Sequence, residues 1–278
     1  MLLFCAPPDG IAEKAGDSGV AEQLQAAKLM QAALAARGAT ADEWRKLDES
    51  YTALIAQNPR DVAVRNARAE FLWDIGDHTR SVAEWQEAEK IDPKNPVILS
   101  HLGSGLLTLG DARKSAGYYM RAVESAPQDP TAHFALANVW FLFRHELLDA
   151  AHPDAESLLT GALAHFAEAS RLAPENAEYA RAYAETFYSV PKPDWAAALD
   201  AWQTVQRLNP QPDFALLNQA RIHLKMSHPD AAKRCLDQIQ SPDYQTLRLL
   251  LETQANSSTG GHSKVPSSPL DSGASNAP

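Results

Sequence analysis

The chain has 278 residues, 45% of them hydrophobic, which is enough to bury the core of one extended domain or of two compact domains. Its 25 basic and 35 acidic residues give a formal net charge of -10, which argues against binding to nucleic acids or anionic membranes, because basic residues must neutralise phosphates there. Two cysteines, Cys5 and Cys235, are too few for a disulfide framework or a thiolate metal site, and no apolar run is long enough for a transmembrane helix.

The first 18 residues contain several Pro, Gly and Asp, so we expect residues 1–18 to form a disordered arm. Residues 1–8 resemble the end of a signal peptide whose basic region is missing. A ragged terminus explains them equally well. Two interpretations of the compartment therefore stay open. The chain is a soluble protein of the cytoplasm, or it is exported to the periplasm if the arm is a truncated signal peptide.

Two helices are predicted next, over residues 20–37 and 40–56. Thr40 and Glu43 have the spacing of a capping box, in which each side chain accepts a hydrogen bond from the backbone N–H of the other residue. The second helix carries apolar residues in the register of later segments, at Leu47, Tyr51 and Leu54. The first helix departs from that register, so we interpret residues 19–59 as an amino-terminal capping helix pair.

Five prolines close successive helical patterns, and the aromatic residue eight positions before each of them repeats as well. The spacings between the prolines are 34, 34, 47 and 36 residues. A nearly fixed period of this length predicts a stack of similar helical units. The prolines are Pro59, Pro93, Pro127, Pro174 and Pro210, and the aromatic residues are Tyr51, Trp85, Tyr119, Phe166 and Trp202.

Each regular unit divides into two helices. In the segment 62–95, a stripe of apolar and small residues with helical spacing precedes Gly76, and a second stripe follows it. Gly76 supplies the permissive backbone that a chain reversal needs, and Gly110 repeats it 34 residues later. The closing proline then stops the second helix. Each unit is therefore predicted to be an antiparallel helix hairpin.

At these positions the sequence resembles the tetratricopeptide repeat family, whose repeat has 34 residues. The clearest copy, residues 96–129, matches that family's pattern at Leu102, Gly103, Leu106, Ser115, Tyr119, Ala122 and Pro127. The resemblance implies an all-α fold, a right-handed α-solenoid of antiparallel helix hairpins that forms a tetratricopeptide-type superhelix. Within residues 60–212 it implies four repeats, at 62–95, 96–129, 130–176 and 177–212. A degenerate fifth repeat and a capping helix are expected at 213–254.

The third repeat contains 13 extra residues near 144–156. We interpret them as a lengthened first helix and a polar loop. An alternative is a metal or acid/base cluster at His145, Glu146 and His152, although the spacing of these residues matches no recognised ligand motif. At the end of the chain, residues 255–278 are rich in Ser, Gly and Pro, and we expect them to form a disordered tail.

The resemblance also implies which side chains face a partner, because the first helices of successive hairpins line a concave groove in this family. The fifth, ninth and twelfth places of these repeats combine aromatic rings, amides and a few charges, which suit capture of an extended peptide. Asparagines there can pair with the backbone of a ligand. The candidate groove residues are Asn66, Glu70, Trp73, Ser100, Ser104, Phe134, Asn138, Phe141, Arg181, Glu185, Tyr188 and Arg221.

Family members that bind the acidic carboxyl terminus of chaperones hold its carboxylate with a set of lysine and asparagine side chains. That clamp is missing here, so a chaperone tail is not the expected partner. The corresponding places hold Asn66, Glu70, His101 and Ala135. Charge instead shifts along the expected groove, which favours a ligand bound in one polarity. The shift runs from Glu70 and Asp74 to Arg181, Arg221 and Lys225.

Three histidines, His101, His133 and His223, lie at equivalent or nearly equivalent places in the first helices of their units. A row of imidazoles along the inner surface would sense pH or bind an anion. Alternatively, each histidine is an ordinary polar member of its helix face.

The repeat register and the lack of a catalytic constellation predict a protein–protein interaction scaffold or assembly factor that binds a peptide or protein partner in the groove. We expect no enzyme activity, no cofactor, no bound metal and no nucleic-acid partner. Two alternatives stay open. One is a metal-dependent or other enzyme that uses the 144–156 insertion, and the other is a structural protein that assembles with itself through its open ends.

Overall fold

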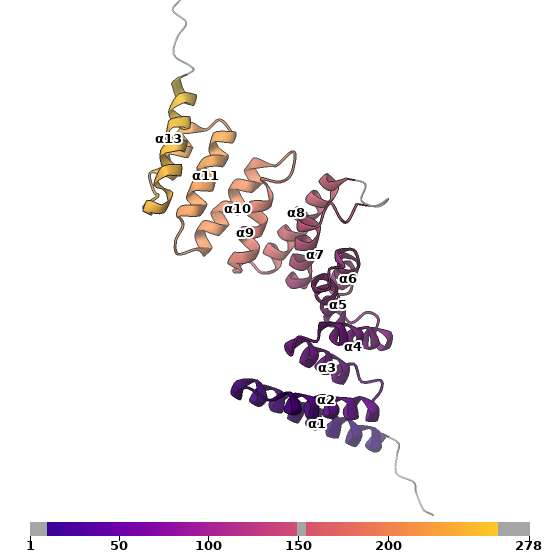
Figure 1. Ribbon diagram of the computed structural model, residues 1–278. Helices are drawn as coiled ribbons and strands as arrows, with labels where there is room; N and C mark the ends of the chain where they lie inside the picture. Colours follow the sequence, from indigo (N-terminus) through magenta and orange to yellow (C-terminus); the bar gives the residue numbers. More distant parts are fainter. Residues whose placement is uncertain (1–9, 149–153, 261–278) are drawn as a thin grey trace, which may run out of the picture. The chain divides into compact units, whose positions relative to one another are not determined.

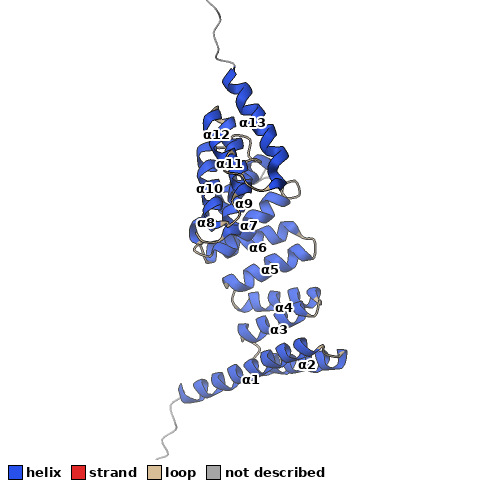
Figure 2. Ribbon diagram, turned by 90° about the vertical axis from the view of Figure 1, so that its left-hand side faces the viewer, coloured by secondary structure: helices blue, strands red, loops and turns tan. Residues whose placement is uncertain are grey.

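The structure is a computed structural model that describes residues 10–148 and 154–260. In these residues all regular structure is helical, and no strand occurs (Figure 2). The chain divides into two compact units, Met1–Leu172 and Ala173–Pro278. The predicted fold class, an all-α protein of the solenoid type built from antiparallel helix hairpins, is confirmed.

The first unit consists of helices that pair in chain order, α1 with α2, α3 with α4, α5 with α6 and α7 with α8 (Figure 1). In the first three of these hairpins, the second helix also packs on the first helix of the next. The bounds are α1 (Gly10–Arg37), α2 (Ala41–Gln57), α3 (Val62–Asp74), α4 (His78–Ile91), α5 (Pro96–Thr108), α6 (Ala112–Ser125), α7 (Pro130–Leu142) and α8 (Ala155–Leu172).

The second unit contains two further hairpins and a closing helix that packs on the last of them. Its helices are α9 (Ala177–Thr186), α10 (Trp195–Leu208), α11 (Asp213–Lys225), α12 (Pro229–Leu236), the short 3-10 helix η1 (Pro242–Tyr244) and α13 (Gln245–Gly260). None of the helices in the described part of the chain is long and apolar enough to cross a membrane.

Side-chain caps set the start of most helices. An Asp or Asn precedes the helix and accepts hydrogen bonds from backbone N–H groups of the first turn, which have no partner within the helix. These caps are Asp61, Asp77, Asn95, Asp111, Asp129, Asn176 and Asp194. At α2 the capping box of Thr40 and Glu43 is present, as the spacing predicts.

Two glycines make the chain reversals in the regular hairpins. Gly76 and Gly110 have φ angles of 82° and 84°, in the left-handed region that glycine adopts without a steric penalty. In each turn the N–H three residues after the helix reaches back to a carbonyl of its last turn, over 2.9 Å from Asp77 to Leu72 and 2.8 Å from Asp111 to Leu106. The sequence therefore predicts these two turns correctly.

The periodic aromatic residues form the core between neighbouring helices. All five are buried, with exposed fractions between 0% and 7%. They are Tyr51, Trp85, Tyr119, Phe166 and Trp202. Small residues make room for them. At Gly103, a Cβ atom would lie 2.9 Å from the Tyr119 ring, closer than carbon atoms pack.

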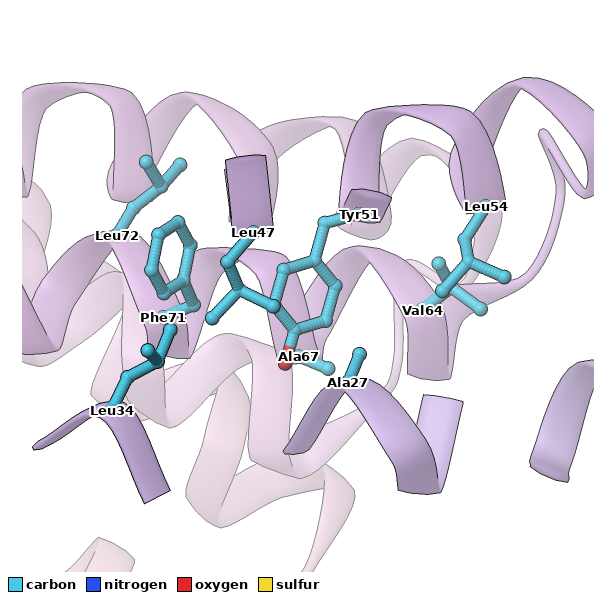
Figure 3. Close-up of a cluster of buried hydrophobic side chains, with 9 residues drawn as sticks. All are labelled: Ala27, Leu34, Leu47, Tyr51, Leu54, Val64, Ala67, Phe71 and Leu72. Carbon is cyan, nitrogen blue, oxygen red and sulfur yellow. The ribbon is translucent and has the colours of Figure 1, made fainter. Parts of the chain in front are cut away.

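The amino-terminal helix pair belongs to the same core as the first regular helix. Side chains from α1, α2 and α3 meet in one cluster, in which the Tyr51 and Phe71 rings stack with centroids 5.5 Å apart (Figure 3). The buried members are Ala27, Leu34, Leu47, Tyr51, Leu54, Val64, Ala67, Phe71 and Leu72.

At both ends, helix extends into segments that we expected to be disordered. Helix α1 begins at Gly10, within the expected arm 1–18, because the segment after Gly10 is rich in Ala, Glu and Lys, which favour helix. Helix α13 continues to Gly260, within the expected tail 255–278. Its residues Leu251 and Ala255, one turn apart, are both buried and hold it in place. Residues 1–9 and 261–278 lie outside the described residues.

The insertion in the third repeat does not lengthen its first helix, contrary to our interpretation. Helix α7 has 13 residues, as α3 and α5 do, whereas α8 has 18 residues against 14 in α4 and α6. The connection begins with a turn that buries Leu147 among core side chains. Arg113 of α6 donates hydrogen bonds to the carbonyls of Glu146 and Leu148, over 2.7 and 3.3 Å. Burial of Leu147 therefore favours a bend after α7 over a longer helix.

Candidate partner-binding surface

Eight of the twelve candidate residues lie in the first unit, on the first helices α3, α5 and α7 of consecutive hairpins. All eight side chains are partly exposed, so each is anchored in the fold and still reaches solvent. We call these eight residues the first-helix face. They are Asn66, Glu70, Trp73, Ser100, Ser104, Phe134, Asn138 and Phe141.

Glu70 on α3 is the charged centre of this face. Its carboxylate accepts a hydrogen bond from Asn66 Nδ2 over 2.8 Å, and it lies 3.6 Å from His101 Nε2 and 3.7 Å from Lys28 Nζ. The His101 contact, followed by the Lys28 charge and the Asn66 hydrogen bond, lowers the pKa of Glu70 although burial opposes this. Glu70 is therefore a carboxylate held by groups from α1, α3 and α5.

A hollow of about 430 Å³ opens beside Glu70, between α1 and α3. Asp74, one turn after Glu70, accepts a hydrogen bond from Gln31 over 2.8 Å, and Gln31 in turn accepts one from Tyr51 over 3.0 Å. The hollow thus has two carboxylates and small alanine side chains on its walls. Its lining residues are Lys28, Gln31, Ala32, Ala35, Glu70 and Asp74.

Asn66 and Trp73 make most of their contacts with other side chains of the protein. Asn66 Oδ1 accepts a hydrogen bond from the indole Nε1 of Trp85 over 2.9 Å, while its Nδ2 donates to Glu70. The Trp73 ring packs against His78 and Trp85, with centroids 4.3 and 5.6 Å apart. The amide of Asn66 is therefore engaged at both ends, and pairing of its second N–H and second lone pair with a ligand backbone stays a prediction.

Helix α5 places small hydroxyl groups in the middle of the first-helix face. Ser100 and Ser104 are one turn apart and partly exposed. Behind them, burial raises the pKa of Tyr119, while a hydrogen bond with Ser104 acts in the opposite direction. His101, between the two serines in the chain, stacks on the Trp85 ring at 4.8 Å with an interplanar angle of 9°. The candidate residues on this helix thus have small side chains.

Helix α7 contributes the aromatic end of the face. The Phe134 and Phe141 rings both meet Phe166 of α8 edge-on, with centroids 5.6 and 6.5 Å apart. Asn138, between them, donates from Nδ2 to the Phe134 carbonyl over 2.9 Å. Arg144 lies over the Phe141 ring, with its guanidinium carbon 5.8 Å from the centroid. Both phenylalanines thus pack on one side and stay partly exposed on the other.

The remaining four candidates lie in the second unit. Arg181 and Glu185 form an ion pair with a 2.7 Å contact, and Arg181 also lies over the Phe214 ring at 5.1 Å. Tyr188 donates to Asn218 Oδ1 over 3.2 Å. Burial raises the pKa of Tyr188 to about 12, although the Arg221 charge lowers it. These side chains are mostly committed to intramolecular contacts.

The three histidines of the expected row have three different environments. His101 stacks on Trp85 and is partly exposed. His133 is buried and contacts His165. His223 lies in the second unit, where its Nδ1 is buried without a partner among the described residues, and burial lowers its pKa. The three imidazoles therefore differ in their exposure and in their contacts.

The alternative site in the insertion is only partly described. His145 and Glu146 are exposed, and Asp154 accepts a hydrogen bond from the backbone N–H of Ser157 at the start of α8. His152 lies outside the described residues. Among residues 10–148 and 154–260, no three His, Cys, Asp or Glu side chains are grouped as metal ligands would be.

Sequence reasoning missed Lys28, Gln31 and His165. The first two lie on α1, whose sequence has no repeat register from which a groove position could be assigned. His165 precedes the periodic aromatic Phe166, and it follows His133 by 32 residues. His165 lies on a second helix, whereas the resemblance assigns groove positions only to first helices.

Repeated hairpins with buried aromatic residues at a fixed place make this chain a helical-repeat protein. Its residues 49–96 and 102–160 match the family model described as tetratricopeptide repeat. The resemblance that the sequence pattern predicts is thus confirmed, and residues 49–160 contain tetratricopeptide repeats.

Among curated proteins, the chain is similar to the small glutamine-rich tetratricopeptide repeat-containing protein 2 of Mycosarcoma maydis. The two are 30% identical over 89 residues, which are 32% of this chain and 25% of that protein. The chain thus matches about a quarter of the length of this relative.

Solved structures share the fold at low sequence identity. YrrB, described as a TPR protein with an unusual peptide-binding site, has a TM-score of 0.55 and 15% identity, and the match covers 77% of this chain and 99% of YrrB. PilF of Pseudomonas aeruginosa has a TM-score of 0.54 and 15% identity, with 86% and 99% covered. A MamA double mutant has a TM-score of 0.51 and 17% identity, with 67% and 94% covered.

Proposed function

We propose that this chain is a protein-interaction scaffold that binds an extended peptide segment of a partner along the first-helix face of the first unit. The observation that carries this proposal is the partial exposure of all eight side chains on three consecutive first helices. A surface of this kind holds a segment through side chains that the fold has already ordered, which lowers the entropy cost of binding. Two similarities support the same proposal. Residues 49–160 contain tetratricopeptide repeats, and YrrB, which shares the fold, is described as having a peptide-binding site.

The chemistry of the face favours a segment with a basic residue towards α3 and an apolar residue towards α7. Glu70 and Asp74 are carboxylates beside the hollow at α3. Ser100 on α5 leaves room for the backbone of the segment. Phe134 and Phe141 offer ring surface at α7, where apolar anchors contribute most binding energy. This arrangement gives the bound segment one direction.

Site-specific photo-crosslinking tests the proposal. We would place a photoreactive residue at Ser100 and, as the matched control, at Gln86, which is exposed on the second helix α4. The Ser100 position should capture a partner segment that the Gln86 position does not capture. Mass spectrometry of the adduct identifies the segment, which is then synthesised.

The synthetic segment allows a quantitative test by fluorescence anisotropy. Replacing Phe134 by Ala should weaken binding at least tenfold, and Glu70→Gln should weaken it less, because the carboxylate is partly screened by Lys28. Equal capture from both crosslinking positions, or unchanged affinity in both variants, would contradict binding on this face.

Self-assembly is a second candidate function, favoured by exposed apolar residues on the helices at the chain ends. Met30 on α1 is 56% exposed beside an apolar groove of about 420 Å³ between α1 and α2, and Leu250 on α13 is 63% exposed. Capping helices of repeat proteins usually present polar outer faces. Light scattering over a concentration series, with Met30→Glu and Leu250→Glu variants, measures whether these surfaces associate.

A further inference from the structure

Two histidines link α7 and α8, the helices of the third repeat. His133 on α7 is 6% exposed, and its Nδ1 lies 2.9 Å from Nδ1 of His165 on α8. The other ring nitrogen of His133, Nε2, lies 3.2 Å from the Pro127 carbonyl oxygen. On the far side, the His165 ring meets Trp140 edge-on, with centroids 5.2 Å apart. The imidazole pair is therefore held on several sides.

These contacts determine the tautomer of each ring in the neutral pair. A carbonyl oxygen can only accept, so His133 Nε2 carries a hydrogen and donates it to Pro127. The Nδ1 of neutral His133 then has a lone pair and accepts. His165 must consequently donate from its own Nδ1 and keep a lone pair on Nε2.

Proton uptake by this pair has two unequal steps. The first proton binds the free lone pair on His165 Nε2 and leaves the hydrogen bond between the two Nδ1 atoms intact. The second proton must bind Nδ1 of His133, which is the acceptor of that bond. Two N–H groups and two positive rings would then face each other across 2.9 Å, so the contact must open.

Charged groups around the pair act on the first step. Glu168, one turn after His165 on α8, interacts with both imidazoles and is itself held by Arg171. Burial lowers the pKa of His165, while Glu168 opposes this effect.

Neighbouring helices add no further charge directed at the pair within the described residues. On α6, Arg121 is bonded to Glu89, and Glu124 is exposed. At the start of α7, Asp129 accepts a hydrogen bond from the Thr131 N–H. Two positive rings across this contact would therefore repel each other, without a second carboxylate to offset the repulsion.

We propose that the His133–His165 pair is a proton-dependent latch between α7 and α8 that controls the aromatic end of the first-helix face. The residues next to the latch in the chain are Phe134 and Phe166, whose rings are in contact. Separation of α7 from α8 therefore displaces Phe134 from Phe166. The effect on a bound segment rests on the proposed function, whereas the latch itself does not.

Nuclear magnetic resonance of the full chain tests the latch without a ligand. Imidazole ¹⁵N shifts at pH 8 should assign Nε2–H to His133 and Nδ1–H to His165. On acidification, His165 should take up one proton first, with little change in the amide shifts of α7 and α8. The second uptake, on His133, should shift those amides together. A Nδ1–H tautomer of His133 at pH 8, or titration of both rings in a single step, would overturn the proposal.

A conservative variant separates the latch from a merely structural role. In His165→Asn, the amide can donate to His133 Nδ1 as the imidazole does, but it does not take up a proton near neutral pH. Its α7 and α8 amides should resemble the wild type at pH 8 and should keep those shifts on acidification, because the neutral amide can turn and accept from a protonated His133 Nδ1. His145→Asn, which removes an exposed histidine of the same repeat, should leave the opening unchanged. Opening at the same pH in wild type and His165→Asn would refute the latch.

Binding of the segment identified by crosslinking tests whether the latch acts on the first-helix face. Its affinity should fall at the pH where the latch opens in the wild type, and it should not fall there in His165→Asn. If the ¹⁵N shifts show the latch but no segment binds this face, the proposed function fails and the latch stands. If a segment binds with the same affinity on both sides of the opening, the latch does not control the face.

Discussion

The regular hairpins of the first unit and the degenerate hairpin α11–α12 make the same turn with different residues. Ser227 has a φ of 61° where the regular turns have Gly76 and Gly110, at 82° and 84°. The N–H of His228 reaches the carbonyl of His223 over 2.8 Å, the same bond that Asp111 makes to Leu106. Backbone hydrogen bonds therefore specify the turn, and the preferred residues add stability to it.

The same contrast extends to the core and to the start of the second helix. Leu236 is fully buried 34 residues after Trp202, at the place where the earlier units have an aromatic ring. Asp77 caps α4 with its side chain, whereas the His228 side chain makes no capping hydrogen bond in the described part of the chain. If the repeat pattern stabilises a fold that the backbone already permits, changes to the pattern should have graded effects.

The largest effect is expected where a periodic aromatic residue is removed. Trp85→Ala deletes a buried ring and leaves Asn66 without its hydrogen-bond donor, so the free energy of unfolding should fall by about 3–5 kcal/mol. Urea unfolding monitored by circular dichroism measures this loss. The control, Gln86→Ala on the exposed side of the same helix, should change stability by less than about 0.5 kcal/mol. A loss below about 1 kcal/mol for Trp85→Ala would show that the ring is not an essential part of this core.

Close contact between neighbouring hairpins predicts a smaller loss at Gly105. A Cβ atom there would lie 2.5 Å from Val82 Cγ2, so Gly105→Val should cost about 1–3 kcal/mol. The corresponding position in the degenerate hairpin, five residues before its turn, holds the fully buried Ile222. Adding Val82→Ala should recover part of the loss, and a double-mutant cycle by urea unfolding measures this coupling. Strictly additive losses would mean that the two residues do not compete for the same space.

The sequence predicts most of this fold because the repeated residues act locally. The closing prolines, Gly76 and Gly110 mark helix ends through their own backbone preferences, and the aromatic series marks the core. The α1 side chains that contact Glu70 and Asp74 could not be predicted. They are Lys28 and Gln31, and their helix has no repeat register. The engagement of Asn66 with Trp85 also depends on packing between helices. Periodicity therefore reveals which positions face inwards, and it does not reveal which polar groups remain available to a partner.

A gain in stability is expected where the degenerate turn is brought back to the pattern. A non-glycine residue in the left-handed region carries a steric cost of roughly 1–2 kcal/mol, part of which is offset by the larger conformational entropy of unfolded glycine. Ser227→Gly should therefore stabilise the second unit by about 1 kcal/mol. Gly110→Ser should destabilise the first unit by a similar amount. Hydrogen exchange of amides in α11–α12 and α5–α6 locates each change, and a loss of protection in Ser227→Gly would contradict this account.

The smallest effect concerns the missing cap of α12. In His228→Asp, the new carboxylate could accept a hydrogen bond from the Ala231 N–H, as Asp77 does from Arg80. Such caps contribute about 1 kcal/mol, but Asp230 in the first turn would repel the added charge, so we expect a net gain of roughly 0.5 kcal/mol. His228→Asn distinguishes the gain from the capping hydrogen bond from the cost of repulsion by Asp230, because it keeps the acceptor and adds no charge. If the Asn variant gains more stability than the Asp variant, and the gap closes at high salt, repulsion limits the cap. If neither variant changes the unfolding midpoint, the short α12 is stabilised by its buried residues, Ala232 and Leu236, rather than by its first turn.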